Sequence, residues 1–137
     1  MAHAKFVVGV TGVVRDDQGR VLLLRHRMWP EGRQWGLPTG YANKSEDFGE
    51  TVEREVREET GPEVKAGRLI HLKSGYKLRV EVAYEALLVG GDLKIDSFEI
   101  LDAKWFSPDE LPEGMQESHR SLALGAEPQH PLPAPGA

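Results

Sequence analysis

The sequence predicts a fold of the α+β or α/β class, in which a sheet packs against helices, and three patterns carry that prediction. Several short runs are rich in β-branched and apolar residues, as strands are. A segment in the middle of the chain repeats apolar residues with the period of a helix, and it has both a start and a stop signal. A second helical segment follows the last strand. Strands combined with one central and one late helix predict a layered sandwich.

Length and composition indicate one acidic domain. The chain has 137 residues, and we expect one domain over residues 1–125 followed by a proline-rich, frayed tail over residues 126–137. It contains no cysteine, which excludes disulfides and thiolate metal sites. The formal charge of -5 argues against a protein that binds nucleic acid through its net electrostatic field. We see no signal peptide and no run near the roughly 18 apolar residues that span a bilayer, so we expect a cytoplasmic protein without membrane contact.

The N-terminal part predicts a β-hairpin and a loop. Residues 5–14 and 20–25 are apolar and β-branched, and the turn sequence DDQG lies between them at 16–19. Residues 26–36 mix proline, glycine, tryptophan and arginine, which is typical of a loop.

The central helix is predicted over residues 48–60. Asp47 can cap its first turn, and Glu50 three residues later completes a capping-box pattern. Gly61 followed by Pro62 ends the helix.

The second half predicts three strands and a late helix. The strands cover residues 64–73, 76–89 and 100–106, a turn lies at 90–92, and a short helix or turn beginning at SPDELP precedes a helix over 115–124. The strand at 76–89 alternates in character, as a half-buried strand does. Its apolar set is Leu78, Val80, Val82 and Tyr84, and its other set is Lys77, Arg79, Glu81 and Ala83.

The central helix has one ordinary side. An apolar stripe runs along it, formed by Phe48, Val52 and Val56. On the opposite side we expect the i,i+4 ion pairs Glu50–Arg54 and Glu53–Arg57, which make a normal solvated face.

Three glutamates of the same helix do not fit that solvated face. Glu55 and Glu59 project close to the apolar stripe and Glu58 lies at its border, so all three turn toward the body of the protein. Buried carboxylates without a partner cost several kcal/mol each. A hard divalent cation, Mg²⁺ or Mn²⁺, fits this oxygen-rich set best, and a buried network with arginine side chains remains the alternative.

Between residues 40 and 62 a spaced set of residues stands out, made up of Gly40, Glu46, Arg54, Glu55, Val56, Glu58, Glu59 and Gly61. Their spacing resembles that of the Nudix box. Pro62 departs from the pattern, since an aliphatic residue is usual there, and this bears on local packing more than on chemistry. The preceding WGLPTG and the later EILDAKWFSPDELP are also similar to the family, so that the resemblance covers about residues 5 to 112.

The resemblance implies a Nudix fold, with a mixed, partly barrel-like sheet between helices. It implies Mg²⁺-dependent hydrolysis of a nucleoside diphosphate linked to another group, in which a metal-activated water attacks phosphorus. Glu55, Glu58 and Glu59 would be metal ligands, together with the carbonyl of Gly40. Arg54 would orient them, paired with Glu46. The proton of the water would pass to Glu58, Glu59 or Glu99.

Basic and aromatic residues near the predicted hairpin are candidates for holding the nucleotide. The candidates are Arg25, His26, Arg27, Arg33, Trp29 and Trp35. The alternative, a solvated or packing residue, is strong for each of them. The overall resemblance favours ADP-ribose or a nucleotide sugar as a small-molecule substrate. The alternatives are an oxidised or ordinary nucleoside triphosphate and, in another class, a non-catalytic nucleotide-sensing module. Because relatives are often dimers, a homodimer is a further expectation.

Overall fold

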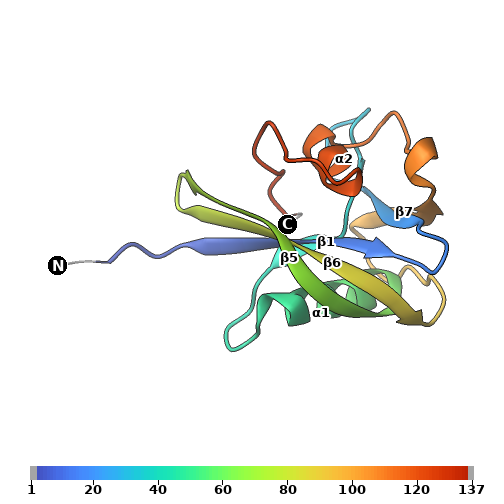
Figure 1. Ribbon diagram of the computed structural model, residues 1–137, viewed down its shortest axis with the longest axis horizontal. Coiled ribbons are helices and arrows are strands. Elements are labelled where there is room, and N and C mark those ends of the chain that lie inside the picture. Colours follow the sequence, from blue (N-terminus) through green and yellow to red (C-terminus); the bar gives the residue numbers. More distant parts are fainter. Residues whose placement is uncertain (1–2, 136–137) are drawn as a thin grey trace.

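The computed structural model describes residues 3–135 and shows one mixed sheet between two helices (Figure 1). The strands are β1 (Val7–Arg15), β2 (Val21–His26), β3 (Trp35–Gly36), β4 (Thr39–Tyr41), β5 (Glu63–Tyr76), β6 (Arg79–Gly90) and β7 (Ile100–Phe106). The helices are α1 (Phe48–Thr60) and α2 (Glu117–Ala123), and a 3-10 turn covers Pro108–Glu110. Neither helix of the described chain is long and apolar enough to cross a membrane.

The sheet is mixed and branched. Its main path runs β3-β2-β1-β6-β5, while β4 adds to β1 and β7 adds to β2. The β1–β6 pair is parallel and the other pairs are antiparallel. The predicted sandwich of the α+β class is therefore confirmed, with a sheet that is not closed into a barrel.

Each face of the sheet has its own core. On one face α1 packs Val52 and Val56 against Val10 and Val14 of β1. On the other face Leu122 of α2 joins a second cluster with alternate residues of β1 and β2. Figure 1 shows α1 below and α2 above the sheet. Because β1 is covered on both faces, its sequence is an almost continuous apolar run.

Most predicted elements are confirmed, but the short strands β3 and β4 were not predicted, and β3 lies in the predicted loop over 26–36. Two predicted elements also differ in detail. The predicted hairpin forms, but the β1–β2 pairing is confined to Arg15 opposite Val21, since β1 continues along β4 instead. The predicted alternation of residues 76–89 is wrong in part. Leu78 lies exposed beside the turn, whereas Glu81 and Ala83 are buried, because both faces of β6 are covered.

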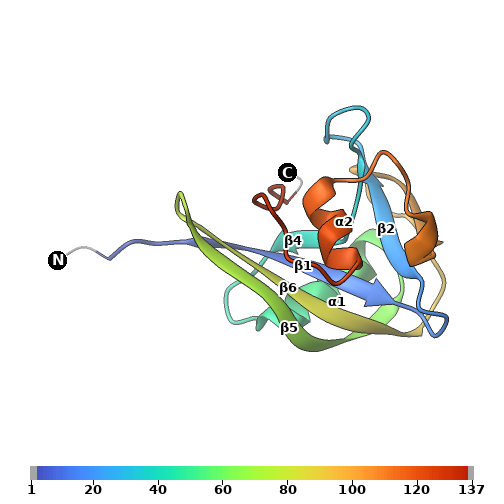
Figure 2. The ribbon, with the colours of Figure 1, turned by 45° about the horizontal axis from the view of Figure 1, so that its top comes forward.

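The expected frayed tail is wrong for the residues that the structure describes. Leu132 is only 3% exposed, and Pro135 is buried against Gly9 of β1. Figure 2 shows this last segment lying near α2, β1 and β4. Apolar side chains among the prolines supply contacts that composition alone did not reveal.

Candidate active site

Helix α1 sets the direction of the glutamates. It begins at the predicted cap, where the Asp47 side chain accepts from the Glu50 N–H and the Glu50 side chain accepts from the Asp47 N–H. Val52 and Val56 are buried in the core, which fixes the rotation of the helix about its axis. The glutamates beside this stripe therefore face the end of β4.

Gly40 and Glu55 lie in direct contact. Gly40 of β4 is held opposite Val10 of β1, and the Glu55 side chain fills the space beside it. A Cβ atom added at Gly40 would lie 2.3 Å from Cδ of Glu55. Only glycine lets the β4 backbone approach this carboxylate so closely.

Glu59 is a half-buried residue, and one of its carboxylate oxygens is buried without a hydrogen-bond partner. Its Oε1 atom contacts no donor among the described residues. Burial raises the pKa of Glu59 to about 9, and the neighbouring carboxylates Glu55, Glu99 and Glu58 add to the effect. A carboxylate in this position calls for a positively charged partner.

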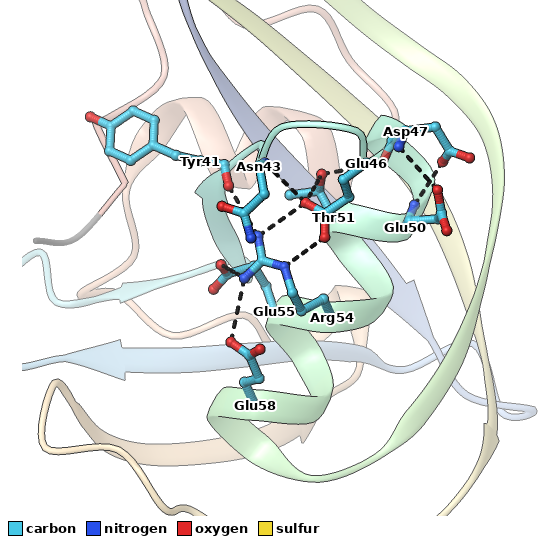
Figure 3. A network of polar contacts seen from close by, with 9 residues as sticks. All are labelled: Tyr41, Asn43, Glu46, Asp47, Glu50, Thr51, Arg54, Glu55 and Glu58. Atoms are coloured by element: carbon cyan, nitrogen blue, oxygen red, sulfur yellow. Dashed lines mark hydrogen bonds and ion pairs between the residues drawn. The ribbon is translucent and has the colours of Figure 1, made fainter.

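Arg54 ties the loop after β4 to the glutamates of α1 (Figure 3). Its Nε donates to Glu46 at 2.7 Å, and its Nη1 donates to Glu55 at 2.7 Å and to Glu58 at 3.3 Å. The hydrogen bond from Arg54 lowers the pKa of Glu46 to about 2 and raises the pKa of Arg54 itself. The predicted pairing of Arg54 with Glu46 is present in the structure.

Two expectations about α1 are corrected. The ion pairs predicted on its solvated side are not made: Arg54 turns to Glu46, and Glu53 accepts the Ala66 N–H of β5 at 2.8 Å. Local backbone donors and the adjacent loop compete with the i,i+4 partners that a wheel suggests. Glu58 is not turned inward, since its side chain is 57% exposed.

Glu55 and Glu59 line an open pocket of about 360 Å³, whereas Glu58 does not line it. Glu99, predicted from the later loop, lies in this pocket together with Glu55, Glu59 and Gly40. The remaining lining residues are His26, Thr39, Tyr41, Asn43 and Ser97. Tyr41, Asn43 and Ser97 were not predicted, although Tyr41 and Asn43 follow Gly40 along the chain and Ser97 precedes Glu99 by two residues.

The predicted nucleotide-binding cations and Trp35 do not line this pocket. Trp35 packs edge-to-face on Phe106 in the α2-side core, and Arg25 lies beside it in the sheet. Arg33 is exposed, and its carbonyl accepts from Gln116.

Arg27 comes nearest to the pocket. Its N–H donates to the Glu99 carbonyl at 2.8 Å, and its guanidinium lies 4.3 Å from the centre of the Phe98 ring. His26, whose ring stacks on buried Trp29 at 3.8 Å, is the residue of the predicted group that reaches the pocket wall.

The residues of the pocket fit a hard divalent cation. They offer several carboxylate oxygens and one backbone carbonyl, which is the donor set that Mg²⁺ and Mn²⁺ prefer. Glu59 Oε1 is buried without a donor, and Gly40 leaves no room for a side chain. Among residues 3–135 no group of three or more His, Asp or Glu side chains is arranged to hold a metal ion. At this pocket, Arg54 holds Glu55 and also Glu58 beside it.

Comparison with known proteins agrees with this geometry. The family model described as NUDIX domain matches residues 5–124. Nudix hydrolase 8 of Arabidopsis thaliana is 30% identical over 119 residues, covering 82% of this chain and 32% of that protein. The NAD-capped RNA hydrolase NudC of Pectobacterium atrosepticum is 30% identical over 102 residues, covering 74% of this chain and 39% of NudC. A MutT-like protein of Streptomyces ambofaciens is 30% identical over 119 residues, covering 87% of this chain and 75% of that protein.

Solved structures share the fold. A MutT NUDIX hydrolase of Burkholderia pseudomallei superimposes with a TM-score of 0.69 at 28% identity, covering 88% of this chain and 96% of the other. An ADP-ribose pyrophosphatase of Streptococcus suis gives a TM-score of 0.68 at 22% identity, covering 86% of this chain and 89% of the other. The chain spans about a third of Nudix hydrolase 8 and about two fifths of NudC. With a family model matched over residues 5–124, and with Gly40, Glu55 and Glu59 of the box lining one pocket, the chain belongs to the Nudix hydrolase family.

Proposed function

We propose that the protein is a Mg²⁺-dependent pyrophosphohydrolase that cleaves the diphosphate linkage of a nucleoside diphosphate derivative. One observation carries the proposal. One carboxylate oxygen of Glu59 is buried without a hydrogen-bond donor, in a pocket that Glu55, Glu99 and Gly40 also line. An arrangement of this kind is costly unless a cation and a phosphate-bearing substrate complete it.

The ion would be held by Glu55, Glu58, Glu59 and the carbonyl of Gly40. Mg²⁺ or Mn²⁺ in this position supplies neutralisation of the diphosphate charge and acidification of a water molecule. Arg54 orients the set, since it holds Glu55 and Glu58 while Glu46 anchors its guanidinium from the loop.

The proton of the attacking water would be taken by a carboxylate at the pocket. Glu99 lines the pocket from the segment that leads into β7, and so does not depend on the helix for its position. Glu58 is exposed and reachable by solvent, which also suits proton transfer. Glu99 and Glu58 are the leading candidates, and Glu59 is the third.

ADP-ribose or a nucleotide sugar is the favoured substrate, and an oxidised or ordinary nucleoside triphosphate is the alternative. The pocket is open, and Arg27 with Phe98 lies at its rim beside Glu99, where a cation and an aromatic ring can meet a phosphate or a base. Relatives named for ADP-ribose and for MutT support both readings. A cytoplasmic location and a homodimer remain predictions.

The first test is a hydrolysis screen over ADP-ribose, nucleotide sugars, nucleoside triphosphates, oxidised triphosphates and dinucleoside polyphosphates. Each compound is incubated with Mg²⁺ and with chelator, and the products are identified by mass. We expect one class to be turned over only with Mg²⁺. Glu59→Gln should lower turnover at least about a hundredfold. The matched control is Glu50→Gln on the same helix, since glutamine also completes the capping box.

A nucleotide-sensing module without catalysis is the candidate from another class. It predicts tight Mg²⁺-dependent nucleotide binding with no turnover of any compound in the screen. Turnover by Glu59→Gln equal to that of the unmodified protein would contradict the assignment of the carboxylates to the metal site.

A further inference from the structure

The last described segment of the chain, residues 127–135, closes a groove on the α2 side of the sheet. We call this segment the C-terminal strap. Leu132 inserts into the apolar cluster beneath α2, and Pro135 lies on Gly9 with its ring carbons 3.5 Å from an ideal Cβ position. The walls and floor of the groove are Gly9, Thr11, Thr39, Arg79 and Glu81. With the strap in place the remaining cavity is only about 10 Å³.

The strap is held by a buried charged cluster in addition to apolar contact. Glu81 of β6 is 6% exposed, accepts the Leu132 N–H at 3.0 Å, and lies 3.4 Å from Arg79 and 3.2 Å from His71. Arg79 donates to the Leu132 carbonyl. The strap therefore presents one donor and one acceptor of its main chain to a carboxylate and a guanidinium.

Buried ion pairs are a poor means of fastening a terminal segment. Removing two charges from water costs free energy that apolar residues of the same size would not incur. A carboxylate beside a guanidinium does, however, suit recognition of a flat polar edge with a donor next to an acceptor. Guanine and uracil present an N–H beside a carbonyl, and adenine presents an amino group beside a ring nitrogen.

The groove adjoins the catalytic pocket through a single strand. Thr39 lines both of them, while Gly40, the next residue, contacts Glu55 on the other face. Strand β4 pairs with β1 alone among the described strands, so its other edge carries no paired strand. A nucleoside diphosphate whose phosphates lie against Gly40 can place its base over Thr39.

We propose that the C-terminal strap is a displaceable plug, which competes with the nucleoside part of the substrate for the groove over Thr39 and the Arg79–Glu81 pair. This inference rests on the proposed function for the identity of its ligand class. Leu132 occupies with its main chain the positions that a nucleobase edge takes when the strap leaves. The apparent affinity for nucleotide then equals the affinity of the released form multiplied by the fraction of molecules with the strap released.

The test measures nucleotide affinity by calorimetry with Mg²⁺ and, in turn, ADP, GDP, CDP and UDP. Leu132→Asp and a chain ending at Ala126 both release the strap and leave the groove walls intact. The matched control is Leu124→Asp, because Leu124 lies just after α2, is 55% exposed and contributes to neither core cluster. We expect both released forms to bind at least one nucleotide about tenfold or more tighter than the unmodified protein and the control. Equal affinities, or binding by no form, would overturn the plug.

An engineered disulfide that holds the strap in place provides a second test, in case the variants with a released strap fold poorly. The chain has no cysteine, so Gly9→Cys with Pro135→Cys creates one unambiguous pair at positions already in contact. The oxidised form should lose nucleotide binding, and reductant should restore it, whereas each single cysteine variant should respond to neither treatment. Binding that is the same in both redox states would overturn the plug.

The two proposals fail separately. Strap-dependent binding without turnover in the substrate screen would leave the plug standing and refute hydrolysis. Turnover together with nucleotide binding that does not depend on the strap would support hydrolysis and refute the plug.

Discussion

Replacing Gly40 by alanine tests the contact between β4 and the glutamates directly. The added Cβ would lie 2.3 Å from Cδ of Glu55, whereas ordinary contact begins near 3.4 Å, so the carboxyl group must move by about 1.1 Å. Glu55 is also held by Arg54 at 2.7 Å, and the displacement breaks or stretches that ion pair. The side chain is the movable partner, because the β4 backbone is fixed by its pairing with β1.

The expected result is a large loss of turnover with a small loss of stability. A misplacement of about 1 Å in a catalytic group costs on the order of a hundredfold in rate, equivalent to about 2.7 kcal/mol in the barrier. Overpacking would cost about 1–3 kcal/mol of folding stability in a rigid core. Because Glu55 can turn toward the open pocket, we expect the lower end of that range.

The assay compares kcat and the free energy of unfolding in urea for Gly40→Ala and for Gly67→Ala. Gly67 is a fair control, since it lies in β5 and an added Cβ would meet only the Glu85 carbonyl at 3.5 Å. The control should keep its turnover. A Gly40→Ala enzyme with unchanged kcat would refute the placement of Glu55 in the catalytic set.

Further predictions concern metal binding, orientation, pH dependence and the end of α1. In chelator, Glu59→Gln should be at least as stable as the unmodified protein, because it removes a carboxylate with a buried, unpartnered oxygen. It should also lose the rise in melting temperature that Mg²⁺ causes, and a retained rise would contradict the assignment of Glu59 to the metal site. Arg54→Lys should lower kcat about 10–100-fold, since lysine cannot bridge several carboxylates, and a kcat equal to the unmodified enzyme would show that orientation does not matter. Burial lowers the pKa of His119 to about 3, so the unfolded state binds one more proton between about pH 6.5 and 3, and stability is lost as pH falls through that range. His119→Asn, measured by urea unfolding at several pH values, should flatten the dependence near pH 5 by about 1.4 kcal/mol per pH unit, and an unaltered slope would argue against a neutral buried imidazole. Gly61→Ala should cost about 1 kcal/mol in urea unfolding because Gly61 has φ of 98°, and a neutral effect would mean that the turn relaxes.

Local signals in the sequence were enough to predict the central helix. The Asp47 cap, the capping box and the Gly61 stop act over a few residues, and the observed helix spans the predicted 48–60. The side that carries Glu55 and Glu59 followed from the position of Val52 and Val56. Signals of this range survive any tertiary arrangement, which is why they could be recognised in advance.

Contacts between distant segments could not be predicted in the same way. The ion pair expected between Glu50 and Arg54 was wrong because Arg54 binds Glu46, which lies in a loop eight residues earlier. The expectation of a frayed tail was wrong because Leu132 is buried and its N–H donates to Glu81. Trp35 and Arg25, expected near the nucleotide, lie in the sheet away from the catalytic pocket. Strand alternation and pairing decide which face a side chain reaches, and a one-residue change reverses it.

The sequence by itself determined the family, the helix that carries the glutamates and the chemistry for which they are suited, since spacing along one helix needs no tertiary information. Only the tertiary structure decided that β4 brings Gly40 against Glu55 and that Glu99, from the segment before β7, lines the same pocket. It also decided that the C-terminal strap fills the neighbouring groove. These outcomes depend on the pairing of β1 with β4 and β6 and of β2 with β7, in which many weak contacts between remote residues act together.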